Sequence, residues 1–207
     1  MRAITLLAAT LLASLLMLPP AAVGDPLDDG RGDAPAGVPA RYLLIDGNGR
    51  AVTHEDFPGR FQLLTFGYTY CPDVCPTTLA EMAAVMKALG DDATRLQPIF
   101  ISVDPERDTP SQLRSYVAFF HPALLALTGS PQLLRRAADS FKVRYEKVRE
   151  PGAATGEYTL DHSAGMFLLG PDGVYLRKFG YGLPVAQVAA AIREIMAVSP
   201  QRTGRPP

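Results

Sequence analysis

Cys71 and Cys75 are the residues of this chain whose type and spacing best fit chemistry, and they are its only cysteines. Three residues separate them, and the apolar run 61–70 comes directly before the pair. Two thiols this close together can form a reversible disulfide or bind one soft metal ion. The pair therefore predicts a redox site or a soft-metal site.

The residues around the cysteines predict a strand, a tight turn and a helix. The run 61–68 is apolar and aromatic without a helical period, which is typical of a buried strand. Pro76 suits the first position of a helix, because its missing N–H would be unpaired there, and apolar residues then repeat at helical spacing up to Gly90. We expect residues 72–75 to form the turn. Cys75 should then lie near the helix N-cap, where unpaired N–H groups and the helix dipole lower the pKa of a thiol.

Two structural explanations of the cysteines are weaker. A disulfide across so short a loop would stabilise the fold by only about 2 kcal/mol, which a domain with a large apolar core hardly needs. Two buried free thiols are the other explanation. The flanking Pro72 and Pro76 and the intervening Asp73 favour instead a strained, partly open turn.

The overall composition predicts one folded domain. The 207 residues carry a formal net charge of −1, and 47% of them are hydrophobic, which is enough for one domain with a full core. Nothing in this charge indicates a nucleic-acid partner.

The two ends of the chain predict an exported protein. Residues 1–24, in which Arg2 precedes a short apolar run, are typical of a signal peptide or a short signal anchor. We expect a flexible linker over 25–38, the folded domain over 39–199 and a disordered tail over 200–207. The expected location is the periplasm or the outer face of the cytoplasmic membrane, and an uncleaved anchor would keep the domain close to the membrane.

The remaining pattern predicts strands that are separated by helices. The expected elements are a hairpin over 42–53, a strand over 98–103, helices starting at Thr109-Pro110 and Ser130-Pro131, a hairpin over 163–179 and a last helix from Pro184. This order predicts an α/β fold, namely a mixed sheet with helices on both faces and an N-terminal hairpin. A cysteine motif at the end of an early strand makes the arrangement thioredoxin-like.

One of the three histidines is suited to complete the site. His54 and His121 lie in positions typical of solvated surface residues. We expect His162 to enter the first strand of the closing hairpin, and in a thioredoxin-like fold that segment lies beside the cysteine turn. Two thiolates and one imidazole would form a three-coordinate soft site, which favours Cu(I) over harder divalent ions. Asp161 could orient the imidazole or accept backbone hydrogen bonds, and the sequence leaves both possibilities open.

Several phrases of the chain resemble the Sco/SenC family of copper-handling proteins, which carry a CxxxC motif and a distal histidine on a thioredoxin-like fold. The phrases, found in order within residues 39–198, are residues 66–69, 71–76, 100–110 and 161–163. The resemblance implies that Cys71, Cys75 and His162 bind copper, as Cu(I) or Cu(II), and that the two cysteines cycle between dithiol and disulfide. It also implies a copper chaperone that helps assemble the dinuclear copper centre of cytochrome c oxidase. Its partners would be the copper-site subunit of the oxidase and a copper-donor chaperone. The short N-terminal apolar run departs from the membrane-anchoring helix common in the family.

Other functions use the same residues. An extracytoplasmic thiol-disulfide oxidoreductase would need Cys71 and Cys75 but not His162. A redox or copper sensor would use all three. A peroxidase is disfavoured, because the Thr/Ser-x-x-Cys pattern with its supporting arginine is not evident around Cys71. For the acidic phrase 104–108 we expect a structural role, with Arg107 paired locally.

Overall fold

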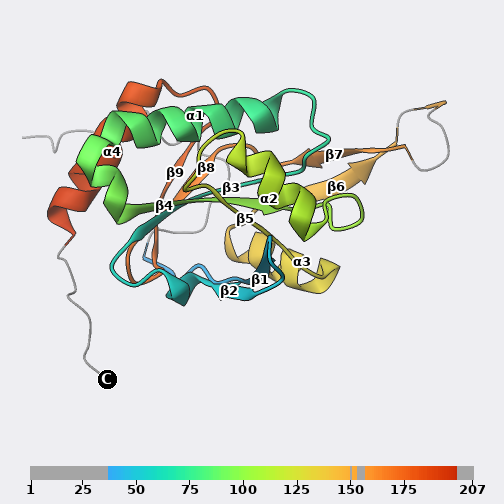
Figure 1. Cartoon of the computed structure of the whole chain (residues 1–207), viewed down its shortest axis with the longest axis horizontal. Coiled ribbons are helices and arrows are strands. Elements are labelled where there is room, and N and C mark those ends of the chain that lie inside the picture. Colours follow the sequence, from blue (N-terminus) through green and yellow to red (C-terminus); the bar gives the residue numbers. More distant parts are fainter. Residues whose placement is uncertain (1–36, 150, 153–156, 200–207) are drawn as a thin grey trace, which may run out of the picture.

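The computed structural model describes residues 37–149, 151–152 and 157–199, in which strands and helices alternate (Figure 1). The strands are β1 (Leu43–Asp46), β2 (Ala51–Thr53), β3 (Phe61–Gly67), β4 (Leu96–Ser102), β5 (Leu125–Thr128), β6 (Tyr145–Val148), β7 (Thr159–His162), β8 (Met166–Leu169) and β9 (Tyr175–Phe179). The α-helices are α1 (Val74–Leu89), α2 (Pro110–Ala118), α3 (Pro131–Ser140) and α4 (Val185–Val198), and two short 3-10 helices are η1 (His54–Asp56) and η2 (Gly90–Arg95).

Seven of the strands form one mixed sheet in the order β2-β1-β5-β4-β3-β8-β9. The central strands β3, β4 and β5 run parallel to one another, and β1, β2, β8 and β9 add antiparallel pairs on the two sides. The predicted N-terminal hairpin is therefore confirmed. Strands β6 and β7 form a separate antiparallel pair that projects from the body (Figure 1).

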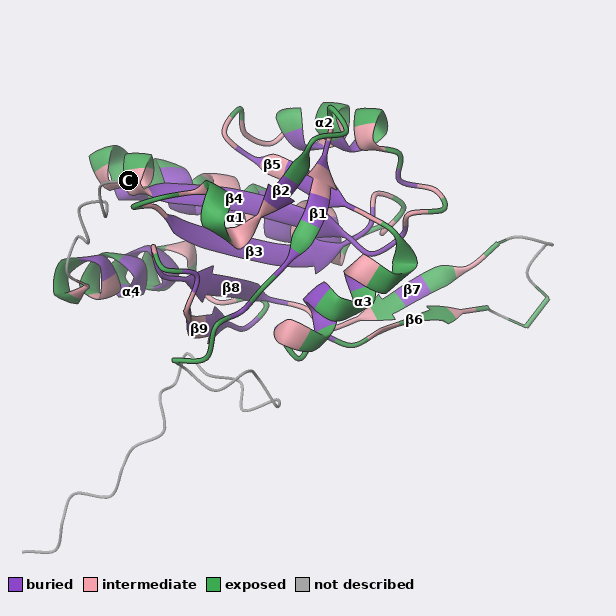
Figure 2. Ribbon diagram, turned by 90° about the horizontal axis from the view of Figure 1, so that it is seen from below, coloured by how far each residue is buried: buried purple, intermediate pink, exposed green. Residues whose placement is uncertain are grey.

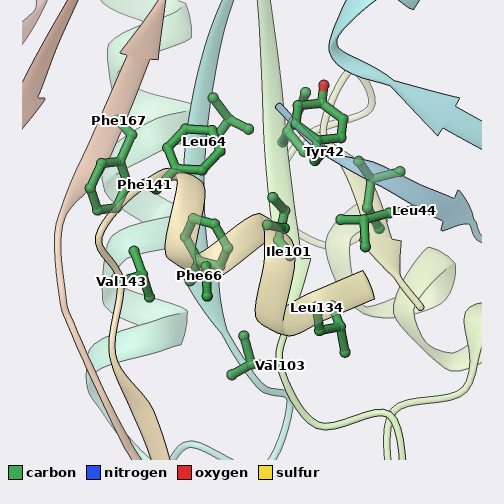
Figure 3. Packing of buried hydrophobic residues seen from close by; sticks show 14 of the residues in the cluster. Tyr42, Leu44, Leu64, Phe66, Ile101, Val103, Leu134, Phe141, Val143 and Phe167 are labelled. Atoms are coloured by element: carbon green, nitrogen blue, oxygen red, sulfur yellow. The ribbon is translucent and has the colours of Figure 1, made fainter. Parts of the chain in front are cut away.

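Helices cover both faces of the main sheet, as the sequence predicts. Every residue of β3 and β4 is buried, because each strand supplies apolar side chains to both faces (Figure 2). On one face the strands pack against α3, where the rings of Phe66, Phe141 and Phe167 meet edge to face at centroid distances of 5.4 to 5.8 Å (Figure 3). On the other face α1, α2 and α4 cover the sheet with residues such as Met82, Leu113 and Ile192.

Two helices begin where the sequence places them, because their capping residues satisfy N–H groups of the first turn. Thr109 accepts a hydrogen bond from the Gln112 N–H, and the Gln112 side chain accepts one from the Thr109 N–H. Ser130 caps α3 by accepting the Leu133 N–H. The last helix begins one residue after Pro184, which serves as its N-cap.

Three of the strands were not predicted from the sequence. Strand β5 is a short apolar run between Pro122 and Gly129, and periodicity alone does not distinguish such a run from a loop or a piece of helix. Strands β6 and β7 are mostly polar and partly exposed, because they pair with each other outside the main sheet. The 163–179 prediction holds for β8 and β9, but the first of these starts at Met166.

The predictions for the ends of the chain fall mainly outside the described residues. These are the signal peptide or anchor over 1–24, most of the linker over 25–38 and the tail over 200–207. At the start of the described part, the Gly37 N–H donates to the Tyr175 carbonyl and the Tyr175 N–H donates to the Val38 carbonyl. Within the described ranges, no helix combines the length and the apolar character needed to cross a membrane.

Candidate metal centre

The two cysteines lie where β3 passes into α1. The helix starts at Val74, with Asp73 as its N-cap residue, so Cys75 is the second helical residue and Pro76 the third. The prediction that Pro76 opens the helix is therefore wrong by two residues. A proline at the third position is tolerated because the first four N–H groups of a helix have no intrahelical partner. Both cysteines are free thiols, and the Cys75 N–H donates to Cys71 Sγ at 3.5 Å.

Gly67, the last residue of β3, gives Cys75 the room that it needs. A Cβ built on Gly67 would lie 2.6 Å from Cys75 Sγ and 2.9 Å from an edge carbon of the Phe100 ring. Distances below 3.0 Å are essentially never seen for a real Cβ. Gly67 is therefore a supporting residue of the site. The sequence predicted it only as part of a strand.

Asp108 fixes the backbone that leads from β3 to Cys71. Its buried carboxylate accepts hydrogen bonds from the Thr69 N–H at 3.0 Å, from the Thr69 hydroxyl at 2.5 Å and from the Ser102 hydroxyl at 2.6 Å. The end of β4 is thereby joined to the chain two residues before Cys71. The expected structural role of the 104–108 phrase is confirmed here, and the local pair of Arg107 with Asp104 is present at 2.5 Å.

His162 reaches the cysteines from the separate hairpin. It is the last residue of β7, not part of the closing hairpin, and its register partner is Tyr145 of β6. Its Nε2 lies 3.4 Å from Cys75 Sγ, and its ring packs edge-on against Tyr68 with the centroids 6.1 Å apart. The expectation that this segment lies beside the cysteine turn is confirmed, although the strand that carries His162 was assigned wrongly.

A hydrogen bond at one imidazole nitrogen of His162 leaves the other nitrogen free to act as a ligand on the side of the cysteines. Nδ1 lies 3.2 Å from the Ser163 carbonyl oxygen, which can only accept, so Nδ1 carries the proton of the bond. In the neutral ring Nε2 then presents its lone pair toward Cys75. Burial lowers the pKa of His162, which favours this neutral form, while the Ser163 carbonyl and the charge of Asp161 act in the opposite direction. Of the two roles left open for Asp161, hydrogen bonding to the imidazole is not observed, because Ser163 occupies that position.

The helix N-terminus does not give Cys75 a low pKa. Cys75 is only 3% exposed, and burial raises the pKa of its thiol, against the expectation from its place at the start of α1. The Tyr68 backbone hydrogen bond acts in the opposite direction but does not compensate. Cys71, in contrast, is partly exposed. A bound cation would favour the thiolate of Cys75 in a way that the helix end alone does not.

The other two histidines take no part in the site. His54 was predicted to be a solvated surface residue, but its side chain is only 12% exposed and packs beside Tyr42 and Gly173, so this prediction is wrong. His121 is partly buried and accepts the Ala123 N–H at Nδ1, a local structural bond at the end of α2.

The ligand atoms of Cys71, Cys75 and His162 all lie within 4.8 Å of one another. Two sulfurs and one imidazole nitrogen gathered in this way form a group that could hold one metal ion. A mixed sheet covered by helices, with this group at the end of a central strand, defines a thioredoxin-like protein with a candidate soft-metal site. The SCO1/SenC family profile matches residues 31–197, and the chain belongs to that family.

Its relatives include proteins of known structure. The chain is 38% identical over 158 residues to human Protein SCO2 homolog, mitochondrial, a match that covers 75% of this chain and 59% of the human protein. The crystal structure of Arabidopsis thaliana ScoI with copper bound is 36% identical, with a TM-score of 0.71, and the match covers 77% of this chain and 99% of that chain. BsSco, a member of the Sco family of cytochrome c oxidase assembly proteins in which a disulfide switch was identified, is 26% identical with a TM-score of 0.62 over 81% of this chain and 99% of that chain. These matches confirm the predicted thioredoxin-like Sco fold.

Proposed function

We propose that this protein binds one copper ion through the thiolates of Cys71 and Cys75 and Nε2 of His162, and passes it to the dinuclear copper centre of cytochrome c oxidase. The observation that carries the proposal is the convergence of these three ligand atoms within 4.8 Å. Their chemistry selects for a soft ion, since two thiolates and one imidazole suit Cu(I) better than oxygen-preferring cations.

The comparisons support copper as the metal and the oxidase as the destination. The Arabidopsis relative was crystallised with copper bound, and BsSco belongs to the cytochrome c oxidase assembly proteins. The corresponding partners of this chain would be the copper-site subunit of the oxidase and a copper donor. An exported location, either in the periplasm or tethered at the outer face of the membrane, belongs to the same proposal. It is supported by the signal-like composition of residues 1–24.

A second function, thiol-disulfide exchange with the cysteines of a copper-site subunit, is favoured by the unequal exposure of the two thiols. Cys71 is partly exposed and Cys75 is buried against it, so an incoming disulfide would meet Cys71 first and Cys75 could then displace the mixed disulfide. The net reaction would oxidise the two thiols to one disulfide and reduce the partner's disulfide to two thiols. A sensor of copper or redox state would rest on the same residues.

Complementation of a deletion strain separates these functions. The full chain should restore oxidase activity under copper limitation, and added copper should partly replace it if delivery is the missing step. Copper delivery requires His162, whereas thiol exchange does not, so His162→Ala should fail to restore activity while both cysteines remain. Full restoration by His162→Ala would favour the oxidoreductase, and normal oxidase assembly in the deletion strain at every copper level would contradict the proposal.

A further inference from the structure

The position of His162 depends on how the β6–β7 hairpin is held. Within the described part of the chain β7 pairs with β6 alone, and neither strand joins the main sheet. Both strands project from the body with largely exposed or half-buried residues (Figure 2). The backbone ladder of the main sheet therefore does not fix His162, and side-chain contacts between the hairpin and the body contribute to its position.

Arg107 makes several of these contacts, all of them with the segment just before β7 or with the residue that supports it. Its Nε donates to Asp104 Oδ2 at 2.5 Å, and its Nη1 donates to the Tyr158 carbonyl oxygen at 2.9 Å. The guanidinium also lies over the Tyr158 ring, 3.7 Å from the centroid. Tyr158 immediately precedes β7, so Arg107 binds the chain four residues before His162.

Asp104 completes a closed set of contacts. The Asp104 side chain is fully buried, and its second carboxylate oxygen accepts a hydrogen bond from the Tyr158 hydroxyl at 2.7 Å. Asp104 thereby binds both Arg107 and Tyr158, and Arg107 binds both Asp104 and Tyr158. A planar, five-donor guanidinium can make these bonds and stack on the ring at once, whereas the ammonium of a lysine cannot.

Tyr68 links this cluster to the candidate metal ligands. The guanidinium carbon of Arg107 lies 5.5 Å from the Tyr68 ring centroid, and the same ring packs edge-on against His162. The Tyr68 carbonyl accepts the Cys71 N–H at 3.3 Å. Arg107 therefore acts on the hairpin that carries His162 and on the residue that both His162 and Cys71 contact.

We propose that Arg107 is a positioning residue of the metal site: it fixes the β6–β7 hairpin so that His162 Nε2 stands at the cysteines before the metal arrives, and it thereby raises the affinity for copper. The inference rests on the proposed function. Its physical basis is preorganisation, because a ligand already held in place loses less conformational freedom on binding.

The test compares Arg107→Lys with Arg114→Lys. Arg107→Lys keeps a positive charge beside buried Asp104, which protects the fold, but loses the fork that joins Asp104 to Tyr158. Arg114→Lys is the matched control, since Arg114 hydrogen-bonds Gly47 and Asn48 in the turn between β1 and β2. With one charge-assisted hydrogen bond lost, we expect copper affinity, measured by competition with a Cu(I) chelator, to fall about tenfold for Arg107→Lys and not for Arg114→Lys.

Two further readouts distinguish positioning from general stability. In the His162→Ala background, Arg107→Lys should change copper affinity by less than about twofold, because its effect passes through His162. In the metal-free protein, the amides of β6 and β7 should exchange about tenfold faster in Arg107→Lys while those of β3 and β4 stay protected. Tyr158→Phe removes only the hydroxyl that donates to Asp104. It should lower the copper affinity and speed the exchange of the β6 and β7 amides, each by a smaller factor than Arg107→Lys does.

Unchanged hairpin exchange in Arg107→Lys, or an equal loss of affinity with and without His162, would overturn the inference. Other results would overturn the proposed function itself. The wild-type protein would then take up no copper, or His162→Ala would bind copper as tightly as the wild type. The exchange measurement on metal-free protein would still decide whether Arg107 holds the strand that carries His162.

Discussion

Gly67 and Cys75 approach so closely that a methyl group on Gly67 would lie 2.6 Å from the Cys75 sulfur. Gly67→Ala should therefore push Cys75 Sγ away from His162 Nε2 and weaken metal binding. Overpacking a buried site of this kind costs about 1–3 kcal/mol in the free energy of unfolding.

Copper titration and denaturant unfolding of the Gly67→Ala protein measure the two effects. Gly129→Ala is the control, because there the added Cβ would meet a flexible side-chain end of Leu44 at 3.1 Å, away from the cysteines. If Gly67→Ala bound copper like the wild-type protein, Cys75 would not depend on the space beside β3.

The two thiols should differ in reactivity in the reduced, metal-free protein. Cys71 is partly exposed, whereas Cys75 is buried and its pKa is raised, so an alkylating reagent should modify Cys71 first. Peptide mass spectrometry over a time course gives the order. Copper should protect both thiols, and mild oxidation without metal should join them in a disulfide. Faster labelling of Cys75 would show that the helix end activates this thiol after all.

Loss of the Asp108 carboxylate should disturb the turn that precedes Cys71. Asp108→Ala leaves the Thr69 N–H and the Ser102 hydroxyl without their buried acceptor, each at a cost of about 1–3 kcal/mol. Asp46→Ala is a matched control, because Asp46 is also buried and accepts backbone N–H groups, but in the turn between β1 and β2. Both variants should lose stability in thermal unfolding, and Asp108→Ala alone should also lose copper affinity and change the order of thiol labelling.

His162 should titrate below its ordinary pKa of 6.5 in the metal-free protein. Because the folded state binds this proton less tightly than the unfolded chain does, the contribution of His162 to stability is full above pH 6.5 and falls as the pH drops below that value. Nuclear magnetic resonance of the imidazole protons measures the midpoint directly. A midpoint above 6.5 would mean that Asp161 and the Ser163 carbonyl outweigh burial.

The sequence was sufficient to predict every strand of the main sheet except β5, the capped helices and the identity of the three candidate ligands. Strand β3 and the caps at Thr109 and Ser130 are local features, in which neighbouring residues decide the structure. The β6–β7 hairpin is different, because its strands are short and polar and contact the body through residues distant in the sequence, such as Arg107.

The raised pKa of Cys75 could not be predicted from the neighbouring sequence either. The place of Cys75 in the first turn of α1 indicates a lowered pKa, but its burial in the core beside Gly67 is a tertiary property. Burial then outweighs the helix end. The role of Gly67 had a sequence signal, since a glycine that ends a buried strand beside a functional turn commonly marks a close approach.

Anaerobic titration of the reduced protein with Cu(I) tests the central claim most directly, with Cys71→Ser, Cys75→Ser and His162→Ala in parallel. The wild-type protein should bind one copper ion. Each cysteine variant should lose most of its affinity, since a hydroxyl replaces a thiolate, and His162→Ala should bind more weakly with an altered absorption spectrum. Unchanged stoichiometry and absorption in all three variants would contradict the account.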